Sequence, residues 1–129
     1  MGIGEAGTGS TWPAAAAGRL SVGTRQVAGA VVCSLAGELD LDSLGPAREA
    51  LEAATAAGQP MLVVDLAGLQ FCDSSGLNLL LQTRLAAESA ALPMRLVALA
   101  PQVARVFEIT GAGTVFSIHD SVDEALASG

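Results

Sequence analysis

Hydrophobic and polar positions change their spacing along the chain in a regular way. Residues 19–27 (RLSVGTRQV) and 28–40 (AGAVVCSLAGELD) predict two strands joined across Ala28-Gly29-Ala30, with alternating positions over residues 31–36. Three further strands are predicted by the apolar runs MLVVDL (61–66), MRLVAL (94–99) and TVFSI (114–118). The nearly unbroken apolar runs at 61–66 and 94–99 are typical of strands that are covered on both faces, and TVFSI predicts a final short strand.

Helical spacing separates these strands. Apolar positions recur every three or four residues in four stretches, at Leu44–Ala47–Leu51–Ala54, Leu77–Leu80–Leu81–Leu85, Val103–Val106–Phe107–Thr110 and in the final SVDEAL. Asp42 or Ser43 can cap the first helix, and Gly58 follows it. The third helix is expected to stop at Gly111, while Ser121 and Glu124 have the spacing of a capping box for the last helix.

The predicted order is therefore β-β-α-β-α-β-α-β-α. Strands that alternate with helices favour an α/β fold with a mostly parallel sheet, and the leading hairpin adds one antiparallel pair. Residues 1–18 are mainly Gly, Ala, Ser and Thr without a period, and we expect a disordered leader there. Residues 19–129 are expected to form one domain.

Composition excludes several classes of function. The net charge is −7, from 13 acidic residues and six arginines without any lysine, so direct nucleic-acid binding is not expected. No apolar run approaches the roughly 20 residues that span a bilayer, and no basic segment precedes the alanines near the start. We therefore expect no membrane or secretory segment and a cytoplasmic location.

The candidate metal ligands are sparse. Cys33, Cys72 and His119 lie far apart without ligand-like spacing, so neither a metal nor another cofactor is expected. Both cysteines are interpreted as small apolar side chains in the core. An oxidation-sensitive role for Cys72, beside Asp73, is left open at this stage.

The sequence FCDSSG (71–76) concentrates polar residues immediately before the leucine-rich second helix. Asp and Ser are preferred N-caps, so a purely structural cap explains this pattern by itself. A serine nucleophile would need the elbow G-x-S-x-G and a base, and His119 is the only histidine. A nucleotide-binding loop is poorly matched, because this turn has a single glycine and no lysine to contact a phosphate, and the negative charge of Asp73 would repel it.

Phosphorylation of a serine is a third possible role for this segment, besides a nucleophile and a nucleotide-binding site. A phosphate on the first turn of a helix interacts favourably with the helix dipole, by about 0.3–1 kcal/mol, so the fold tolerates it. The added charge of about −1.5 to −2 would penalise an acidic or desolvated partner surface. A serine at this position is therefore suited to switch a protein contact off.

Three segments together resemble a STAS domain, most closely those of bacterial anti-sigma factor antagonists. They are GELDLDS (37–43), VVDLAGLQFCDSSGLNLLL (63–81) and FEITGAGTVFSIHDSVDEAL (107–126), and the likeness extends from about residue 20 to residue 126. The resemblance implies a small α/β domain whose mixed sheet is flanked by helices mainly on one face. It also implies a regulator of transcription rather than an enzyme.

By this resemblance, Ser74 matches the serine that a cognate anti-sigma factor with serine kinase activity phosphorylates. The unphosphorylated form would bind that anti-sigma factor and release a sigma factor, and a serine phosphatase would restore it. Asp40 matches the acid of the family's G-E-L-D loop, near the serine. The resemblance also implies that the surface that binds the partner includes Glu38, Asp73, Ser75 and Gly76. From the residues alone, without the motif, Glu38 and Asp40 are interpreted as part of a solvated loop with Asx-turn hydrogen bonds.

Two departures from the family pattern stand out. Ala112 occupies a place where leucine often follows Thr-Gly, and Gly45-Pro46 stiffens the first turn of the first helix. Two rival functions remain open. One is a STAS module of a sensor complex or lipid-transport system that phosphorylation does not control; the other is a serine hydrolase that uses His119.

Overall fold

The predicted mixed sheet is present, and its five strands lie side by side in sequence order. The computed structural model describes residues 20–127, so the expected leader at 1–18 lies outside the described residues. The strands are β2 (Leu20–Val27), β3 (Ala30–Leu39), β4 (Leu62–Cys72), β5 (Met94–Val97) and β6 (Ser117–His119). β2 and β3 are antiparallel, and the pairs β3–β4, β4–β5 and β5–β6 are parallel.

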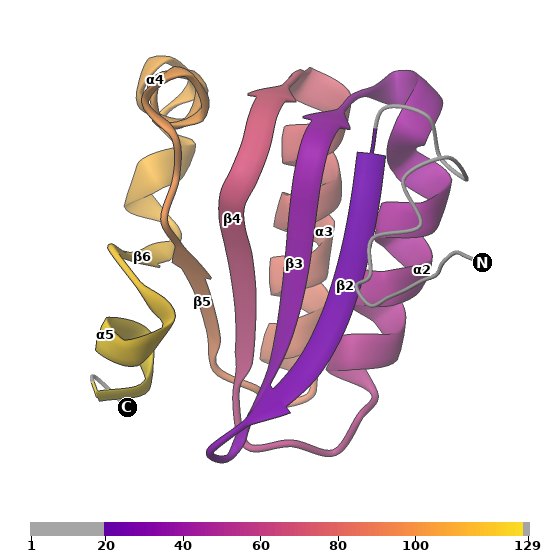
Figure 1. Ribbon diagram of the computed structural model, residues 1–129, viewed down its shortest axis with the longest axis vertical. Helices are drawn as coiled ribbons and strands as arrows, with labels where there is room; N and C mark the ends of the chain where they lie inside the picture. Colours follow the sequence, from indigo (N-terminus) through magenta and orange to yellow (C-terminus); the bar gives the residue numbers. More distant parts are fainter. Residues whose placement is uncertain (1–19, 128–129) are drawn as a thin grey trace, which may run out of the picture.

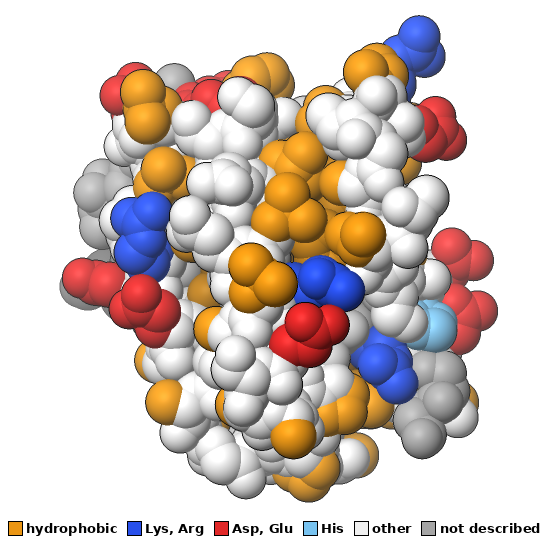
Figure 2. Space-filling model, turned by 180° about the vertical axis from the view of Figure 1, so that it is seen from behind, with side chains coloured by type: hydrophobic (Ala, Val, Ile, Leu, Met, Phe, Trp, Pro, Cys, Tyr) orange, Lys and Arg blue, Asp and Glu red, His pale blue; other side chains and the backbone are white. Residues whose placement is uncertain are grey.

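Helices cover mainly one face of this sheet, as expected. They are α2 (Leu44–Thr55), α3 (Ser74–Ser89), α4 (Pro101–Thr110) and α5 (Val122–Ala127), with short 3-10 turns η2 (Leu41–Ser43) and η3 (Ala112–Thr114). Figure 1 shows α2 and α3 behind β2, β3 and β4. Seen from behind, hydrophobic side chains reach the surface between scattered charged ones (Figure 2).

The alternation of side chains along the strands divides the core in two. Cys33, Leu35 and Val64 belong to the larger cluster, which α2, α3 and α4 complete with residues such as Leu51 and Phe107. Their neighbours point to the other face, where a smaller cluster contains Val32, Val63, Val97 and Ala125 of α5. Three helices therefore pack on one face, and α5 packs on the other.

The strand predicted at 61–66 is longer than its apolar run. β4 extends to Cys72, because residues 68–72 continue the pairing with β3 as far as Leu39 and Cys72. The register shifts between Ser34 and Ala36, where a Cβ on Gly68 would lie 2.8 Å from the Cβ of Ala36. Glycine thus permits close strand contact at an irregularity, and the predicted loop before DSSG is strand instead.

The last strands are shorter than predicted. β5 ends at Val97 rather than at residue 99, and residues 112–114 form η3, so that β6 begins only at Ser117. The expected stop at Gly111 is confirmed by its left-handed conformation, with φ of 77°. Among residues 20–127, no helix has the length and apolar character needed to cross a membrane.

Candidate functional site

The candidate site lies where β3 and β4 end together. Leu39 and Cys72 are paired at the ends of these parallel strands, so the segments that follow them emerge at the same edge of the sheet. After β3 comes η2, and after β4 comes α3. The sequence motifs GELD and DSSG, separated by more than thirty residues, are thereby placed next to each other.

Asp73 joins these two segments through both carboxylate oxygens. Its Oδ1 accepts a hydrogen bond from the backbone N–H of Gly76 at 2.9 Å and so caps α3. Its Oδ2 accepts one from the backbone N–H of Leu41 at 3.3 Å. The backbone N–H of Asp73 donates to the carbonyl of Leu39 at 3.2 Å. The helix-cap interpretation of Asp73 is therefore confirmed, and the same side chain also holds the opposite loop.

Gly76 is buried where α3 passes over the end of β3. A Cβ at this position would lie 2.7 Å from the carbonyl oxygen of Leu39, 2.8 Å from the Leu39 Cγ and 3.1 Å from the Cys72 Sγ. Contacts below 3.0 Å require atoms to move, and one of these atoms belongs to the backbone. The glycine therefore allows the first turn of α3 to approach the sheet, which sets the position of the serines.

The two serines differ in exposure. Ser74 is the first residue of α3 and is exposed, whereas Ser75 is half-buried. Backbone N–H groups of a helix's first turn have no acceptor within the helix, and Asp73 occupies only that of Gly76. Ser74 therefore presents its hydroxyl to solvent at the positive end of a 16-residue helix.

Asp40 makes an Asx-turn hydrogen bond of the kind expected from the residues alone, although the residue is buried rather than solvated. Its Oδ1 accepts a hydrogen bond from the backbone N–H of Asp42 at 3.1 Å, and the Ser43 hydroxyl accepts one from the backbone N–H of Asp40 at 2.9 Å. This reciprocal cap begins η2, which leads directly into α2. Asp42 and Ser43, the predicted caps, make no side-chain cap at the start of α2, because the chain first makes a 3-10 turn.

An open acidic groove of about 480 Å³ lies beside these loops. Its lining contains the carboxylates of Glu38, Asp40, Asp42 and Asp73, together with Leu41 and Phe71. Leu41 is 69% exposed and Phe71 is 48% exposed. Neither side chain was predicted from the sequence to belong to the site. The available signal was the alternation at the end of β4, since Phe71 must face away from its buried neighbour Cys72 once the strand reaches that far.

Cys72 is enclosed rather than reactive. Only 2% of the residue is exposed, and burial together with the charge of Asp73 raises the pKa of its thiol to about 11. Burial also raises the pKa of Cys33 to about 11. Both thiols therefore stay protonated near neutral pH, where the thiolate is the reactive form. The structure supports the interpretation of both cysteines as small core residues.

His119 is held in a different part of the sheet. It ends β6, which is separated from β4 by β5, and its Nδ1 lies 3.7 Å from the Glu124 carboxylate. Its Nε2 is 3.3 Å from the hydroxyl of Ser117. The structure does not join it to Ser74 as a nucleophile–base pair. Among the described residues, no group of His, Cys, Asp and Glu is arranged to hold a metal ion.

Comparisons with known proteins agree with this architecture. A comparison with curated protein sequences gives no match. Among solved structures, an anti-sigma factor antagonist from Mycobacterium paratuberculosis is 27% identical, with 84% of this chain and 92% of that chain covered and a TM-score of 0.74. SpoIIAA, an anti-sigma factor antagonist, is similar in its unphosphorylated form, at 28% identity, 81% and 92% coverage and a TM-score of 0.68.

The same relative is also known in a phosphorylated form. That structure, described as the Bacillus cell fate determinant SpoIIAA, is 27% identical, with 83% and 97% coverage and a TM-score of 0.64. The family model "Mlab, STAS domain" matches residues 22–120, which is most of the chain and includes the GELD and DSSG motifs. The chain is thus a member of the STAS domain family whose structural neighbours include anti-sigma factor antagonists.

Proposed function

We propose that this protein is an anti-sigma factor antagonist whose partner binding is switched by phosphorylation of Ser74. The observation that carries the proposal is the exposure of Ser74 at the N-terminus of α3, beside a groove that combines four carboxylates with two exposed apolar side chains. The similarity to SpoIIAA, which is known in a phosphorylated form, supports it. No catalytic step by this chain is needed, and ATP is a substrate of the kinase.

The geometry favours Ser74 over Ser75 as the acceptor. A kinase must bring the serine hydroxyl in line with the γ-phosphate, which an exposed side chain permits and a half-buried one opposes. A phosphate on Ser74 would lie near the first-turn N–H groups of Ser74 and Ser75, which have no acceptor within the helix. The fold therefore accommodates the modification.

The effect of the phosphate falls on the partner. Glu38, Asp42 and Asp73 already give this edge of the sheet a negative surface, and the phosphate would add about −1.5 to −2 charges to it. In the unphosphorylated state, Leu41 and Phe71 can be buried by the anti-sigma factor. In the phosphorylated state, closing the interface would require desolvating the phosphate, which would release the anti-sigma factor and allow it to capture its sigma factor again.

Phosphopeptide mapping tests the proposal. The purified chain is incubated with ATP and lysate from its own cells, and its peptides are analysed by mass spectrometry beside Ser74→Ala and Ser75→Ala variants. Phosphate on the peptide that contains Ser74, retained in Ser75→Ala and lost in Ser74→Ala, is the expected result. Phosphate that persists in Ser74→Ala would place the modification elsewhere.

An unmodified peptide would favour the rival function within the family. The protein would then be a STAS module whose contacts do not depend on phosphorylation, as in a sensor complex or a lipid-transport system. In that case the DSSG sequence would serve only as the cap of α3. Folding of the chain and phosphorylation of other proteins in the same lysate are the controls for this outcome.

A further inference from the structure

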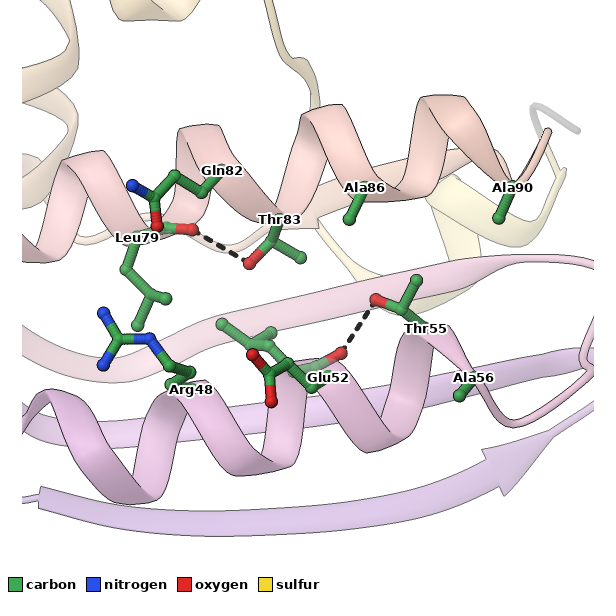
Figure 3. Close-up of a pocket in the computed structure, with 10 residues that line it drawn as sticks. Arg48, Glu52, Thr55, Ala56, Leu79, Gln82, Thr83, Ala86 and Ala90 are labelled. Carbon is green, nitrogen blue, oxygen red and sulfur yellow. Dashed lines mark hydrogen bonds between the residues drawn. The ribbon is translucent and has the colours of Figure 1, made fainter.

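A narrow apolar groove between α2 and α3 is a second surface feature of the molecule. It has a volume of about 370 Å³ and opens to solvent, because most of its lining residues are exposed. Figure 3 shows Ala56, Ala86 and Ala90 along one half of it. These side chains are small and leave the space between the two helices unfilled, while the buried Leu51 and Leu79 add apolar surface to the lining.

The dimensions of this groove fit a single chain of carbon atoms. Its lining runs along α3 from Leu79 to Ala90, a distance of about 16 Å along the helix axis. The mean cross-section is then about 23 Å², which is that of a cylinder roughly 5 Å wide. A helix of a partner or of a second copy is about 10–12 Å across and does not fit. Carbon atoms pack at about 3.5–4.0 Å, so one polymethylene chain does fit.

Two threonines remove hydrogen-bond donors from the apolar part of the groove. The Thr55 hydroxyl donates a hydrogen bond to the carbonyl of Leu51 at 2.8 Å, and the Thr83 hydroxyl donates one to the carbonyl of Leu79 at 2.9 Å (Figure 3). Both hydroxyl protons are used within their own helices. An extended peptide would therefore bury carbonyl groups here without a donor, which is costly. A hydrocarbon chain has no such groups.

The other half of the groove carries two opposite charges. Arg48 and Glu52 lie one turn apart on α2, and Figure 3 shows them in the half that contains Leu79 and Gln82. Within residues 20–127, neither charged side chain forms a hydrogen bond or an ion pair. A purely anionic group would be repelled by Glu52, and a purely cationic group by Arg48. A group with both charges complements the pair.

We infer that the groove between α2 and α3 binds a single-chain amphiphile with a zwitterionic head, such as a lysophospholipid. Its hydrocarbon chain lies along Ala86 and Ala90. The negative group of the head contacts Arg48, and the positive group contacts Glu52. Burial of the chain supplies most of the affinity, because exposed ion pairs contribute little and serve mainly to select the head group. The site does not depend on the function proposed for Ser74.

An NMR titration of the full chain tests this inference. The probe is dodecylphosphocholine, kept below the concentration at which it forms micelles, and dodecyl maltoside offers the same chain on an uncharged head. Ala86→Leu fills the groove without adding a charge. The matched control is Ala53→Leu, at an exposed alanine of α2 outside the groove. Circular dichroism verifies that each variant is folded, and Ala90→Leu replaces Ala86→Leu if the latter is not.

The expected result is a saturable change in the amide shifts of α2 and α3 around the groove. The dissociation constant should rise at least tenfold in Ala86→Leu and stay unchanged in Ala53→Leu. The phosphocholine probe should bind about two- to fivefold more tightly than the maltoside, and Arg48→Gln should remove this preference.

Two outcomes would overturn the inference as a whole. One is the absence of a saturable change at the groove, and the other is wild-type affinity in both Ala86→Leu and Ala90→Leu. Equal affinity of the wild type for the two probes would overturn the assignment of a zwitterionic head to Arg48 and Glu52.

Discussion

The Asp73 carboxylate accepts a hydrogen bond from the backbone N–H of Leu41 at 3.3 Å while it caps α3 through Gly76 at 2.9 Å. One side chain thus couples the start of the helix that carries Ser74 to the loop that exposes Leu41. A change at either segment is expected to affect the other, because the two backbone donors share one carboxylate. The motif DSSG therefore organises the surface as well as providing the serine.

Replacing Asp73 with alanine removes both acceptors. We expect Asp73→Ala to reduce the free energy of unfolding by about 1–2 kcal/mol, the upper range for loss of an N-cap. Asp73→Asn keeps an oxygen that can cap the helix at Gly76 but has no second oxygen for the N–H of Leu41, so it should lose less than alanine. Urea unfolding measures both, and equal losses in the two variants would mean that the contact with Leu41 or the carboxylate charge, rather than the cap, is the important property.

Gly76 offers a steric test of how closely α3 approaches the sheet. Gly76→Ala would bring a Cβ within 2.7 Å of the Leu39 carbonyl oxygen, so we expect a loss of about 1–3 kcal/mol, as for overpacking in a core. Gly45→Ala is the matched control, since a Cβ there has nothing within 4 Å and alanine favours the helix. The control should be neutral or stabilising by up to about 1 kcal/mol. A Gly76→Ala variant as stable as wild type would contradict the close packing.

Much of this fold follows from local patterns in the sequence. The order of elements and the parallel pairing were predicted because buried strands and amphipathic helices differ in the spacing of apolar residues. The extension of β4 to Cys72 was not predicted, because residues 67–72 lack an unbroken apolar run. These residues form a strand because they pair with β3. That pairing depends on contacts between distant segments, which local spacing does not record.

The candidate site shows the same division. Ser74 and Asp73 were identified from the DSSG motif, and Asp40 from the GELD motif. The cap of η2 by Asp40 is made locally, within residues 40–43, whereas the exposure of Leu41 and Phe71 depends on how two loops meet in space. Phe71 in particular belongs to a residue type that is often buried, and it faces solvent because Cys72 beside it on the strand faces the core.

The cysteines provide a prediction on pH. Their folded-state pKa values of about 11 exceed the ordinary 9.0, so the unfolded chain loses these protons first as pH rises. Stability from the two thiols is therefore fully present below pH 9 and should fall between pH 9 and 11. Urea unfolding across this range, compared with a Cys33→Ala/Cys72→Ala variant, measures the effect. The variant, although less stable overall, should show a smaller decline of the free energy of unfolding between pH 9 and 11. An equal decline in both proteins would mean that other groups cause it.

Leu41 and Phe71 are predicted to be partner contacts rather than fold determinants. Because both are exposed, Leu41→Ala and Phe71→Ala should change the free energy of unfolding by less than about 0.5 kcal/mol. Each should weaken binding of the anti-sigma factor, once identified, by about tenfold or more, as for a buried apolar anchor. Ile109→Ala on α4, where the side chain is 75% exposed, is the control that should bind as wild type. Calorimetry measures the affinities, and unchanged values for both variants would remove the groove from the interface.

The switch itself is tested by charge at Ser74. Ser74→Ala should bind the anti-sigma factor like the unphosphorylated protein, while Ser74→Asp should bind at least tenfold more weakly, on the order of 1.4 kcal/mol. Gln102→Glu is the matched control, because it adds one negative charge to the exposed first turn of α4 instead of α3. Its affinity should stay near that of the wild type, which separates a local effect from the general increase in net charge. Equal binding by Ser74→Ala and Ser74→Asp, with both variants folded, would exclude control of the contact by charge at this serine.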